Sequence, residues 1–468
     1  MEHEHPESKI STVRAMIAIA VCKLLRKILR ITGHGGTNLP GKVALRLCPN
    51  ILTLTAAEIH TIIVSGTNGK TTTCRLIEQG LKTSGISLFS NRSGANLLAG
   101  IITEYASNAK WNGAPKKTTA VIECDEAALK LVLDYISPEV IVLTNVFRDQ
   151  LDRYGEVMHT LDELKTAIGK VPKAVLCLNA DDSLVASIAN AFPNPHVFYG
   201  IDSCDQKPHC SEISDAMYCI RCKHRYSYRY VTYAHLGGFL GGFYCPNCRY
   251  ERPEANVAVN AVIEETRENS VVELSIHGRT VRRTIPLPAL YNAYNYLAAL
   301  TAVTAFGLAD LPGFSGGEKV IGFGRMEHFD IGAGVTMILV KNPTGFTQVI
   351  EYLSGLTSEY DLLCCLNDKP QDGTDISWIW DAPLEALSDN GNHVHDVYVS
   401  GTRKEDMYLR LKHAGFPTEC LYTVDKPLGF IRQLAQRTRP VVIVPTYTAM
   451  MELRRSLARK TGSKAFWE

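Results

Sequence analysis

The sequence predicts an α/β protein built from two successive parts, each with a largely parallel sheet covered by helices. Short apolar runs alternate with helical segments between residues 61 and 182, and the alternation returns from about residue 333 onward. Strands that alternate with helices in this way are typical of parallel sheets with both faces covered. Between the two parts, residues 202–252 are rich in Cys, Tyr, Gly and Arg, which indicates a small inserted module.

Composition restricts the class of protein. The 468 residues are 46% apolar and 21% charged, as in folded domains, and 49 basic against 48 acidic side chains leave a net charge of +1. This balance gives no support to bulk electrostatic binding of nucleic acid. Only four of the 14 cysteines fall in Cys-x-x-Cys pairs. A reducing, cytoplasmic compartment with one metal site explains this cysteine usage better than a disulfide framework.

The N-terminal region, residues 1–57, contains a predicted helix and then a glycine-rich turn or loop at residues 33–42. The opening MEHEHPESK is acidic and polar, so no signal peptide is expected. The charge-free run of the helix, residues 15–22, is too short to cross a bilayer. Two interpretations stay open: a helix packed on the protein, or a helix on the inner surface of the cell membrane. One face of the helix carries Ile17, Val21, Leu24, Leu25 and Ile28.

A nucleotide-binding loop is predicted by the stretch VSGTNGKTTT, residues 64–73, which joins a buried strand to a helix. Two glycines allow a tight turn whose backbone N–H groups face a phosphate, and the positive end of the helix favours the same anion. A lysine adds a point charge for the outer phosphates, and threonine hydroxyls are available to Mg²⁺. A plain strand-to-helix turn is the alternative. The candidate nucleotide-binding residues are Gly66, Thr67, Asn68, Gly69, Lys70, Thr71 and Thr72.

Polar residues also follow three further predicted strands, at residues 123–125, 145–149 and 179–182. In open α/β sheets, ligands bind outside the carboxyl ends of the strands. We therefore expect these residues to border the same site as the loop.

Four segments together resemble the Mur ligases and folylpolyglutamate synthases. They are SGTNGKTTT at the loop, TNVFRDQLDRYG at residues 144–155, YNAYN at residues 291–295 and GRME at residues 324–327. The resemblance implies a central P-loop ATP-binding domain at residues 58–322 and a Rossmann-like C-terminal domain at residues 323–468. It also implies a ligase that uses ATP to activate a carboxylate as an acyl phosphate, which an amine then attacks.

The same resemblance implies roles for individual residues. Lys70 and Thr71 would hold the phosphates and Mg²⁺. Glu123 would bind a second Mg²⁺, and it would form the catalytic set of this site with Lys70. Asn292 would contact the adenine, and Arg325 would reach the nucleotide from the linker.

The inserted module carries a Cys-x-x-Cys pair twice, in the contexts CIRC and CPNC. Four thiolates at this spacing are close to the ligand set of structural Zn²⁺ ribbons, and they leave no open position for a substrate. Redox-active thiols are the alternative. The predicted zinc ligands are Cys219, Cys222, Cys245 and Cys248.

A zinc ribbon inside a central domain of this kind narrows the resemblance to the MurT family, the ligase subunits of lipid II isoglutaminyl synthases. DGTDISWIWD at residues 372–381 and VPTYTAM at residues 445–451 are similar to segments of the MurT C-terminal domain. The resemblance implies a heterodimer with GatD, a glutamine amidotransferase subunit, in which an aspartate of the first segment orients the histidine of the partner's Cys–His pair. We assign this catalytic role to Asp375, with Asp372 as the runner-up. An ordinary acidic loop anchored by two tryptophans is the alternative.

The expected function is ATP-dependent amidation of the D-glutamate α-carboxylate of lipid II to D-isoglutamine, with ammonia from a GatD-like subunit. Lys341, in ILVKNP, stands where amino-acid-adding members carry a histidine, which suits ammonia as the acceptor. A stand-alone amino-acid ligase of the Mur or folylpolyglutamate type is the first alternative. A zinc-ribbon protein that binds nucleic acid is the second, against which the neutral net charge argues.

Overall fold

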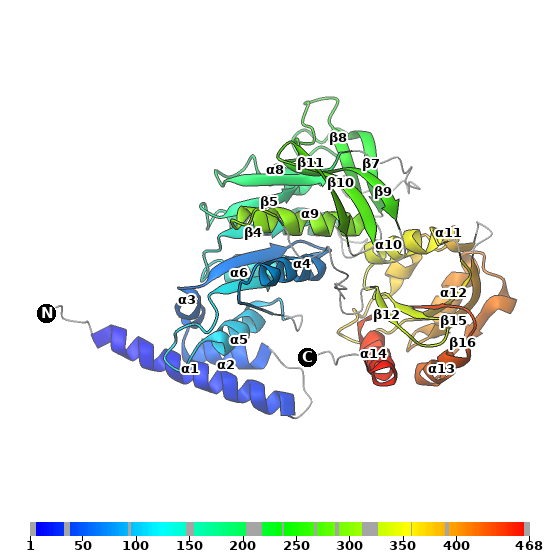
Figure 1. The fold of residues 1–468 in the computed structure, drawn as a ribbon, viewed down its shortest axis with the longest axis horizontal. Coiled ribbons are helices and arrows are strands. Elements are labelled where there is room, and N and C mark those ends of the chain that lie inside the picture. Colours follow the sequence, from blue (N-terminus) through cyan, green and yellow to red (C-terminus); the bar gives the residue numbers. More distant parts are fainter. Residues whose placement is uncertain are drawn as a thin grey trace.

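The computed structural model describes residues 6–31, 38–91, 95–146, 154–202, 218–235, 238–265, 269–285, 290–310, 326–356, 358–388 and 393–462. A nine-stranded sheet organises the central part of the chain, and a six-stranded sheet organises the C-terminal part. Figure 1 shows these two units side by side, with a small two-stranded sheet at the top of the central part.

The nine-stranded sheet is parallel except at one edge. Its strands are β1 (His60–Ser65), β2 (Leu88–Ser90), β3 (Thr119–Glu123), β4 (Val140–Leu143), β5 (Val175–Asn179), β6 (His196–Ile201), β9 (Val257–Glu265), β10 (Ser270–Ile276) and β11 (Arg279–Ile285). Their order is β11-β10-β9-β6-β5-β4-β1-β3-β2. Neighbours run parallel from β9 to β2, whereas β9, β10 and β11 pair antiparallel. The predicted parallel sheet is confirmed, with an antiparallel edge added.

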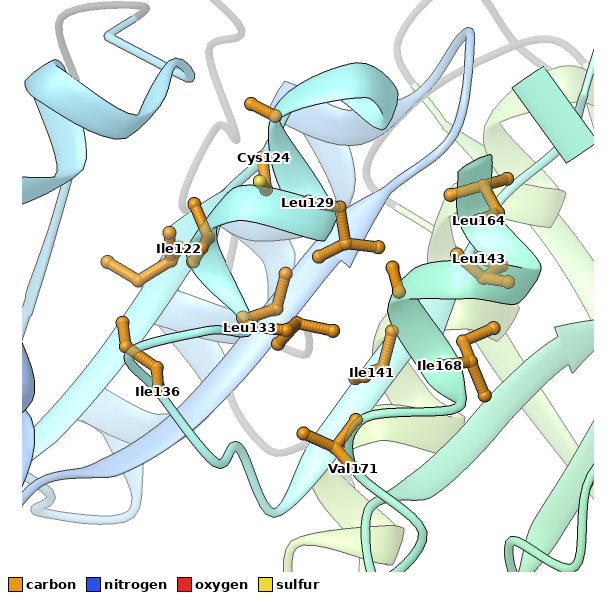
Figure 2. Packing of buried hydrophobic residues seen from close by; sticks show 14 of the residues in the cluster. Ile122, Cys124, Leu129, Leu133, Ile136, Ile141, Leu143, Leu164, Ile168 and Val171 are labelled. Carbon is orange, nitrogen blue, oxygen red and sulfur yellow. The ribbon is translucent and has the colours of Figure 1, made fainter. Parts of the chain in front are cut away.

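Helices cover both faces of this sheet, as predicted. On one face lie α5 (Leu98–Asn108), α6 (Glu126–Val132), α7 (Tyr154–Ile168) and α8 (Ser183–Ile188); on the other lie α4 (Lys70–Thr83) and α9 (Leu290–Ala305). Alternate strand residues supply the two cores, so Ile122 faces the first group and Val121 faces the second. Figure 2 shows the first core, where Ile141 of β4 lies near Ile168 of α7.

Three N-terminal helices, α1 (Pro6–Ile31), α2 (Asn38–Leu47) and α3 (Ile51–Ala56), pack on α5. The prediction of a turn or loop over residues 33–42 is wrong for its second half, because α2 begins at Asn38. Pro40 lies in the first turn of α2, where proline is tolerated. Gly41 approaches α5 so closely that a Cβ there would lie 1.7 Å from the carbonyl oxygen of Ala99.

Helix α1 packs on the protein through Ile19 and three small side chains. The sequence places the large apolar residues Ile17, Leu24 and Ile28 on one face of the helix, and these three side chains are exposed. No helix in the described part of the chain is long and apolar enough to cross a membrane. The buried residues of α1 are Ala15, Ala18, Ile19 and Cys22.

The inserted module forms an antiparallel pair, β7 (Ser227–His235) and β8 (Gly238–Tyr244). Tyr226, Phe243 and Tyr250 pack their rings together, with centroids of Phe243 5.3 Å from Tyr226 and 5.6 Å from Tyr250. These rings join the core beneath α8, so the module is attached to the central domain by apolar packing.

The C-terminal unit is a second α/β domain, as the strand pattern predicts. Its sheet order is β12-β13-β17-β14-β15-β16, parallel except for β12 with β13. Strands are β12 (Glu327–Phe329), β13 (Val335–Met337), β14 (Tyr360–Cys365), β15 (Val394–Ser400), β16 (Leu421–Thr423) and β17 (Val441–Pro445). Helices are α10 (Pro343–Ser354), α11 (Glu385–Ser388), α12 (Lys404–His413), α13 (Pro427–Gln433) and α14 (Tyr447–Thr461).

Candidate active site

The loop between β1 and α4 turns on two glycines. Gly66 has a φ of 119° and Gly69 a φ of 87°, both in the region that favours glycine. A Cβ on Gly66 would lie 2.3 Å from the Thr144 hydroxyl, and one on Gly69 would lie 2.2 Å from Asn295 Oδ1. Both positions therefore need glycine for backbone conformation and for space. Because α4 begins at Lys70, its first N–H groups lie at the loop, where they suit an anion.

Two residues after β4 hold the loop in shape. Thr144 Oγ1 donates to the Asn68 carbonyl at 2.7 Å. Asn145 Oδ1 accepts from the Asn68 N–H at 2.8 Å, and its backbone carbonyl accepts from the Thr67 N–H at 2.9 Å. The TN that opens the segment at residues 144–155 thus braces the phosphate loop. The middle of that segment, residues 147–153, lies outside the described residues.

Lys70 is buried inside the loop. Its ammonium group donates to the carbonyls of Gly66 and Thr67, and it forms an ion pair with Glu126 of α6 at 3.3 Å. A buried cation needs such partners because desolvation is costly. Phosphate oxygens are stronger acceptors than carbonyls for a charged donor, so a nucleotide could replace the loop carbonyls as the partner of Lys70.

Glu123 lies at the carboxyl end of β3, paired in register with Val64 of β1. Asn91 fixes its backbone by accepting from the Glu123 N–H at 2.9 Å and donating to its carbonyl at 2.7 Å. Burial raises the pKa of the Cys74 thiol on α4 well above its usual value; the Glu123 charge raises it further and Lys70 opposes this. Both charges therefore act on the same turn of α4. Binding of Mg²⁺ by Glu123 and Thr71 stays a prediction.

An open cleft lies beside the loop, between the central and C-terminal domains. Its empty space, counted with its open mouth, is about 1070 Å³. Its wall on the C-terminal side includes Lys341 and Gln348. Arg325 lies outside the described residues. Of the predicted nucleotide-binding residues, those that line the cleft are Asn68, Gly69, Thr72 and Asn292.

Asn292 and Asn295 of α9 are joined to the phosphate loop. Asn295 Nδ2 donates to Asn292 Oδ1 at 3.2 Å, and Asn295 Oδ1 accepts from Thr73 Oγ1 at 3.5 Å. Both asparagines are buried, and Asn295 stands directly over Gly69. Hydrogen bonds therefore join the residues predicted to contact the adenine to the loop predicted to bind the phosphates.

Tyr294 links α9 to the inserted module through a buried acid. Its hydroxyl donates to Asp181 Oδ2 at 2.6 Å and lies 2.5 Å from Thr232 Oγ1 of β7. The same carboxylate accepts from Arg252 and from the Ile201 N–H. Burial raises the pKa of Asp181, and the Arg252 guanidinium opposes that shift. Because Thr232 and Arg252 belong to the module, the module is bonded to the helix that lines the cleft.

The four predicted zinc ligands meet at one point of the module. The Sγ atoms of Cys219 and Cys248 are 3.4 Å apart, as are those of Cys222 and Cys245. All four lie within 4.8 Å of one another. Sulfurs around a tetrahedral Zn²⁺ with Zn–S near 2.3 Å would be about 3.8 Å apart, so the cluster fits such an ion. The identity of the metal stays a prediction.

The acidic segment at residues 372–381 lies outside the cleft, in the C-terminal domain. Asp372 is buried and accepts from the backbone N–H of Thr448 at 2.6 Å and from its hydroxyl at 2.5 Å, at the start of α14. Asp375 is exposed, and its Oδ1 accepts from the Ser377 N–H at 2.8 Å. Trp378 is buried, whereas Trp380 is 47% exposed.

Three residues of the site were missed in the sequence: Glu126, Tyr294 and Asp181. Asp181 belongs to the polar group at residues 179–182, whose position at a strand end was noted. No local pattern predicts the contacts of Glu126 and Tyr294, because their partners are 56 and 113 residues away in the chain.

Comparison with known proteins agrees with this fold. Residues 64–221 match the family model of the Mur ligase middle domain, and residues 339–450 match that of the MurT ligase C-terminal domain. MurF ligase from Thermotoga maritima, solved in complex with ADP, superposes with a TM-score of 0.62 at 13% identity, covering 90% of this chain and 85% of that one. The protein thus has the Mur ligase fold and is an ATP-dependent ligase of the kind that forms amide bonds.

Two curated relatives define its place within that class. The chain is 36% identical to the lipid II isoglutaminyl synthase subunit MurT of Streptococcus pneumoniae, over 92% of this chain and 94% of that protein. It is 32% identical to the subunit of the same name from Staphylococcus aureus, over 96% of this chain and 98% of that protein. The chain belongs to the MurT family.

Proposed function

We propose that the protein amidates the α-carboxylate of D-glutamate in the stem peptide of lipid II, giving D-isoglutamine, with ammonia from a GatD-like glutaminase subunit. The observation that carries the proposal is a braced nucleotide loop that opens on an interdomain cleft, in a chain similar over nearly its whole length to lipid II isoglutaminyl synthase subunits. Such a reaction belongs in the cytoplasm, at the inner face of the membrane that holds the lipid-linked substrate.

The residues around the loop fit ATP and Mg²⁺. Lys70 and the N–H groups of the loop would hold the phosphates, and Thr71 and Glu123 would ligate Mg²⁺. Asn292 would contact the adenine, and Arg325 would reach the nucleotide. Bound Mg²⁺ offsets the negative charge of the transferred phosphoryl group.

In the proposed reaction, a carboxylate oxygen attacks the γ-phosphorus, ADP leaves, and an acyl phosphate forms. Ammonia then attacks the acyl carbon, phosphate leaves, and the nitrogen loses a proton to give the amide. Negative charge gathers on phosphoryl oxygens in the first step, and Lys70 stabilises it from the loop side. Lys341, on the opposite wall of the cleft, faces the same space as a second cation.

The exposed acid Asp375 is the proposed contribution of this chain to the partner's active site. A triad aspartate orients a histidine and stabilises its charged form. Asp372 is unsuited to that role because both of its carboxylate oxygens are bonded to Thr448. We further propose that the four-cysteine module is a structural zinc ribbon and that the C-terminal domain is Rossmann-like in class.

The test is an acceptor assay with ATP and lipid II, in which the product is identified by mass spectrometry. We expect the chain alone to use ammonium, and to use glutamine only when the glutaminase subunit is added. Preferential addition of an amino acid would replace the proposal with a stand-alone ligase. Salt-dependent RNA binding without carboxylate-dependent ATP hydrolysis would favour the nucleic-acid alternative instead.

A further inference from the structure

The outward face of α1 carries a continuous apolar stripe. At about 100° per residue, five large aliphatic residues of α1 fall within roughly 60° of one another on the helix surface. Each of these side chains is between 47% and 76% exposed. The stripe extends over about 27 Å of helix, at 1.5 Å per residue. Its members are Val13, Ile17, Leu24, Ile28 and Ile31.

The stripe is not the face by which α1 folds onto the protein. Ala15, Ala18 and Cys22 are buried against the neighbouring helices, on the other side of α1. Arg26 is fixed on that inner side by an ion pair with Glu104 at 2.5 Å. In Figure 1, α1 runs along the lower edge of the central domain, at the opposite end from the β7–β8 module. Ile19 is buried on that inner side too, so the packing of the fold leaves the five large apolar side chains of the stripe facing outward.

The charge around the stripe is mainly positive, with one acid, Glu7, in the first turn of α1. Residues 8–57 contain eight Lys or Arg and no Asp or Glu, although the whole chain has a net charge of only +1. Arg14 and Lys27 flank the stripe on its two sides, and both are exposed. On α2, Lys42 and Arg46 are exposed as well.

We infer that the outward face of α1 binds an anionic lipid bilayer in the plane of its surface. A helix with an apolar stripe between basic flanks buries the stripe at the boundary of headgroups and acyl chains, while its cations attract anionic lipids. A second copy of the chain is a poorer occupant, because it would bring two basic surfaces together. The choice of a bilayer also rests on the proposed function, in which the substrate is lipid-linked.

The experiment is sedimentation of the full chain with vesicles of phosphatidylglycerol and phosphatidylcholine, against vesicles of phosphatidylcholine alone. We expect binding to the anionic vesicles that weakens as salt increases. Replacing Ile17, Leu24 and Ile28 together by Ser should reduce the partition coefficient by about tenfold or more. The matched control replaces exposed Leu409 and Leu428 of the C-terminal domain by Ser, and should bind as the parent does.

A second variant, Lys27→Glu with Arg30→Glu, keeps the apolar stripe. It should weaken binding to the anionic vesicles but not to the vesicles of phosphatidylcholine. The inference is overturned if the parent does not sediment with anionic vesicles, or if the triple Ser variant binds as well as the parent. It is also overturned if that variant instead converts a dimer to a monomer in solution. Amidation of lipid II dissolved in detergent, which needs no bilayer, is measured in parallel. Its failure would contradict the proposed function and leave the vesicle result standing.

Discussion

The phosphate loop at residues 66–72 and the acidic segment at residues 372–381 both carry charged side chains to which we assign a chemical role, but the two regions differ in how these side chains are buried and bonded. In the loop, Lys70 is buried and bonded within the chain, and Asn68 is held by Thr144 and Asn145. In the acidic segment, Asp372 is buried and bonded, whereas Asp375 points to the surface.

This difference indicates which of the two regions needs a partner protein for its chemistry. A loop whose polar groups are held by its own domain is preorganised to stabilise phosphoryl transfer without a partner. An exposed carboxylate lacks the low-dielectric surroundings that make a triad aspartate effective, and a protein partner would supply them. On this basis, changes near the loop should affect amidation with any nitrogen donor, and changes at Asp375 should affect glutamine alone.

The largest effect is expected for Lys70→Ala. It removes the cation proposed to stabilise the phosphoryl oxygens, so amidation should fall on the order of 10³-fold with ammonium and with glutamine alike. The rates with the two donors are compared in the same assay. Because the change also leaves the Glu126 carboxylate without its ion pair, Glu126→Ala is the matched control. It breaks the same pair and should keep most of the activity; an equal loss in both variants would make Lys70 structural.

The second prediction concerns Asp375→Asn. Glutamine-dependent amidation should fall on the order of 10²-fold, because an amide cannot stabilise a charged histidine, while ammonium-dependent amidation stays unchanged. Both rates are measured on the reconstituted complex. Asp372→Asn is the contrast within the segment. It weakens the bonds to Thr448, so it should lower the free energy of unfolding by about 1–3 kcal/mol and affect both donors together. A selective glutamine defect in Asp372→Asn, and none in Asp375→Asn, would reverse the assignment.

The local sequence pattern was sufficient to predict the strand, the turn and the helix near the loop. It could not predict the hydrogen bonds between distant elements. The strand at β1, the glycines and the start of α4 follow from apolar runs and turn chemistry within a few residues. The buried network of Asp181, Tyr294 and Arg252 joins three distant segments, and no local pattern specifies such a contact. Helix α1 shows the same limit, since its periodicity is correct but which face packs depends on the neighbouring helices.

The third prediction tests the module on the nucleotide side. Cys245→Ser should abolish binding of one metal ion per chain and loosen the residues between 218 and 252, because structural metal binding contributes folding energy. Metal content is measured by atomic absorption, and loosening by protease cleavage within the module. We expect the ATP KM to rise with both nitrogen donors. Cys177→Ser, in buried β5, is the control that keeps the metal. Full metal content in Cys245→Ser would show that the four cysteines do not bind the metal.

The smallest effect is expected for Tyr294→Phe. The change removes one hydroxyl, which bonds to Asp181 at 2.6 Å and to Thr232 at 2.5 Å, and leaves the ring that lines the cleft. Since Asn292 and Asn295 lie on the same helix, the ATP KM should rise about two- to fivefold, with kcat nearly constant and no preference between ammonium and glutamine. Tyr250→Phe is matched to it: that hydroxyl belongs to the module but donates to the Ser183 carbonyl at 3.2 Å, away from α9. If both variants raise the KM equally, the effect comes from general loosening of the module. If only Tyr294→Phe raises the KM, the module supports the nucleotide site through this hydrogen bond. The four-cysteine module then belongs with the phosphate loop as a region that affects both nitrogen donors, whereas Asp375 affects glutamine alone.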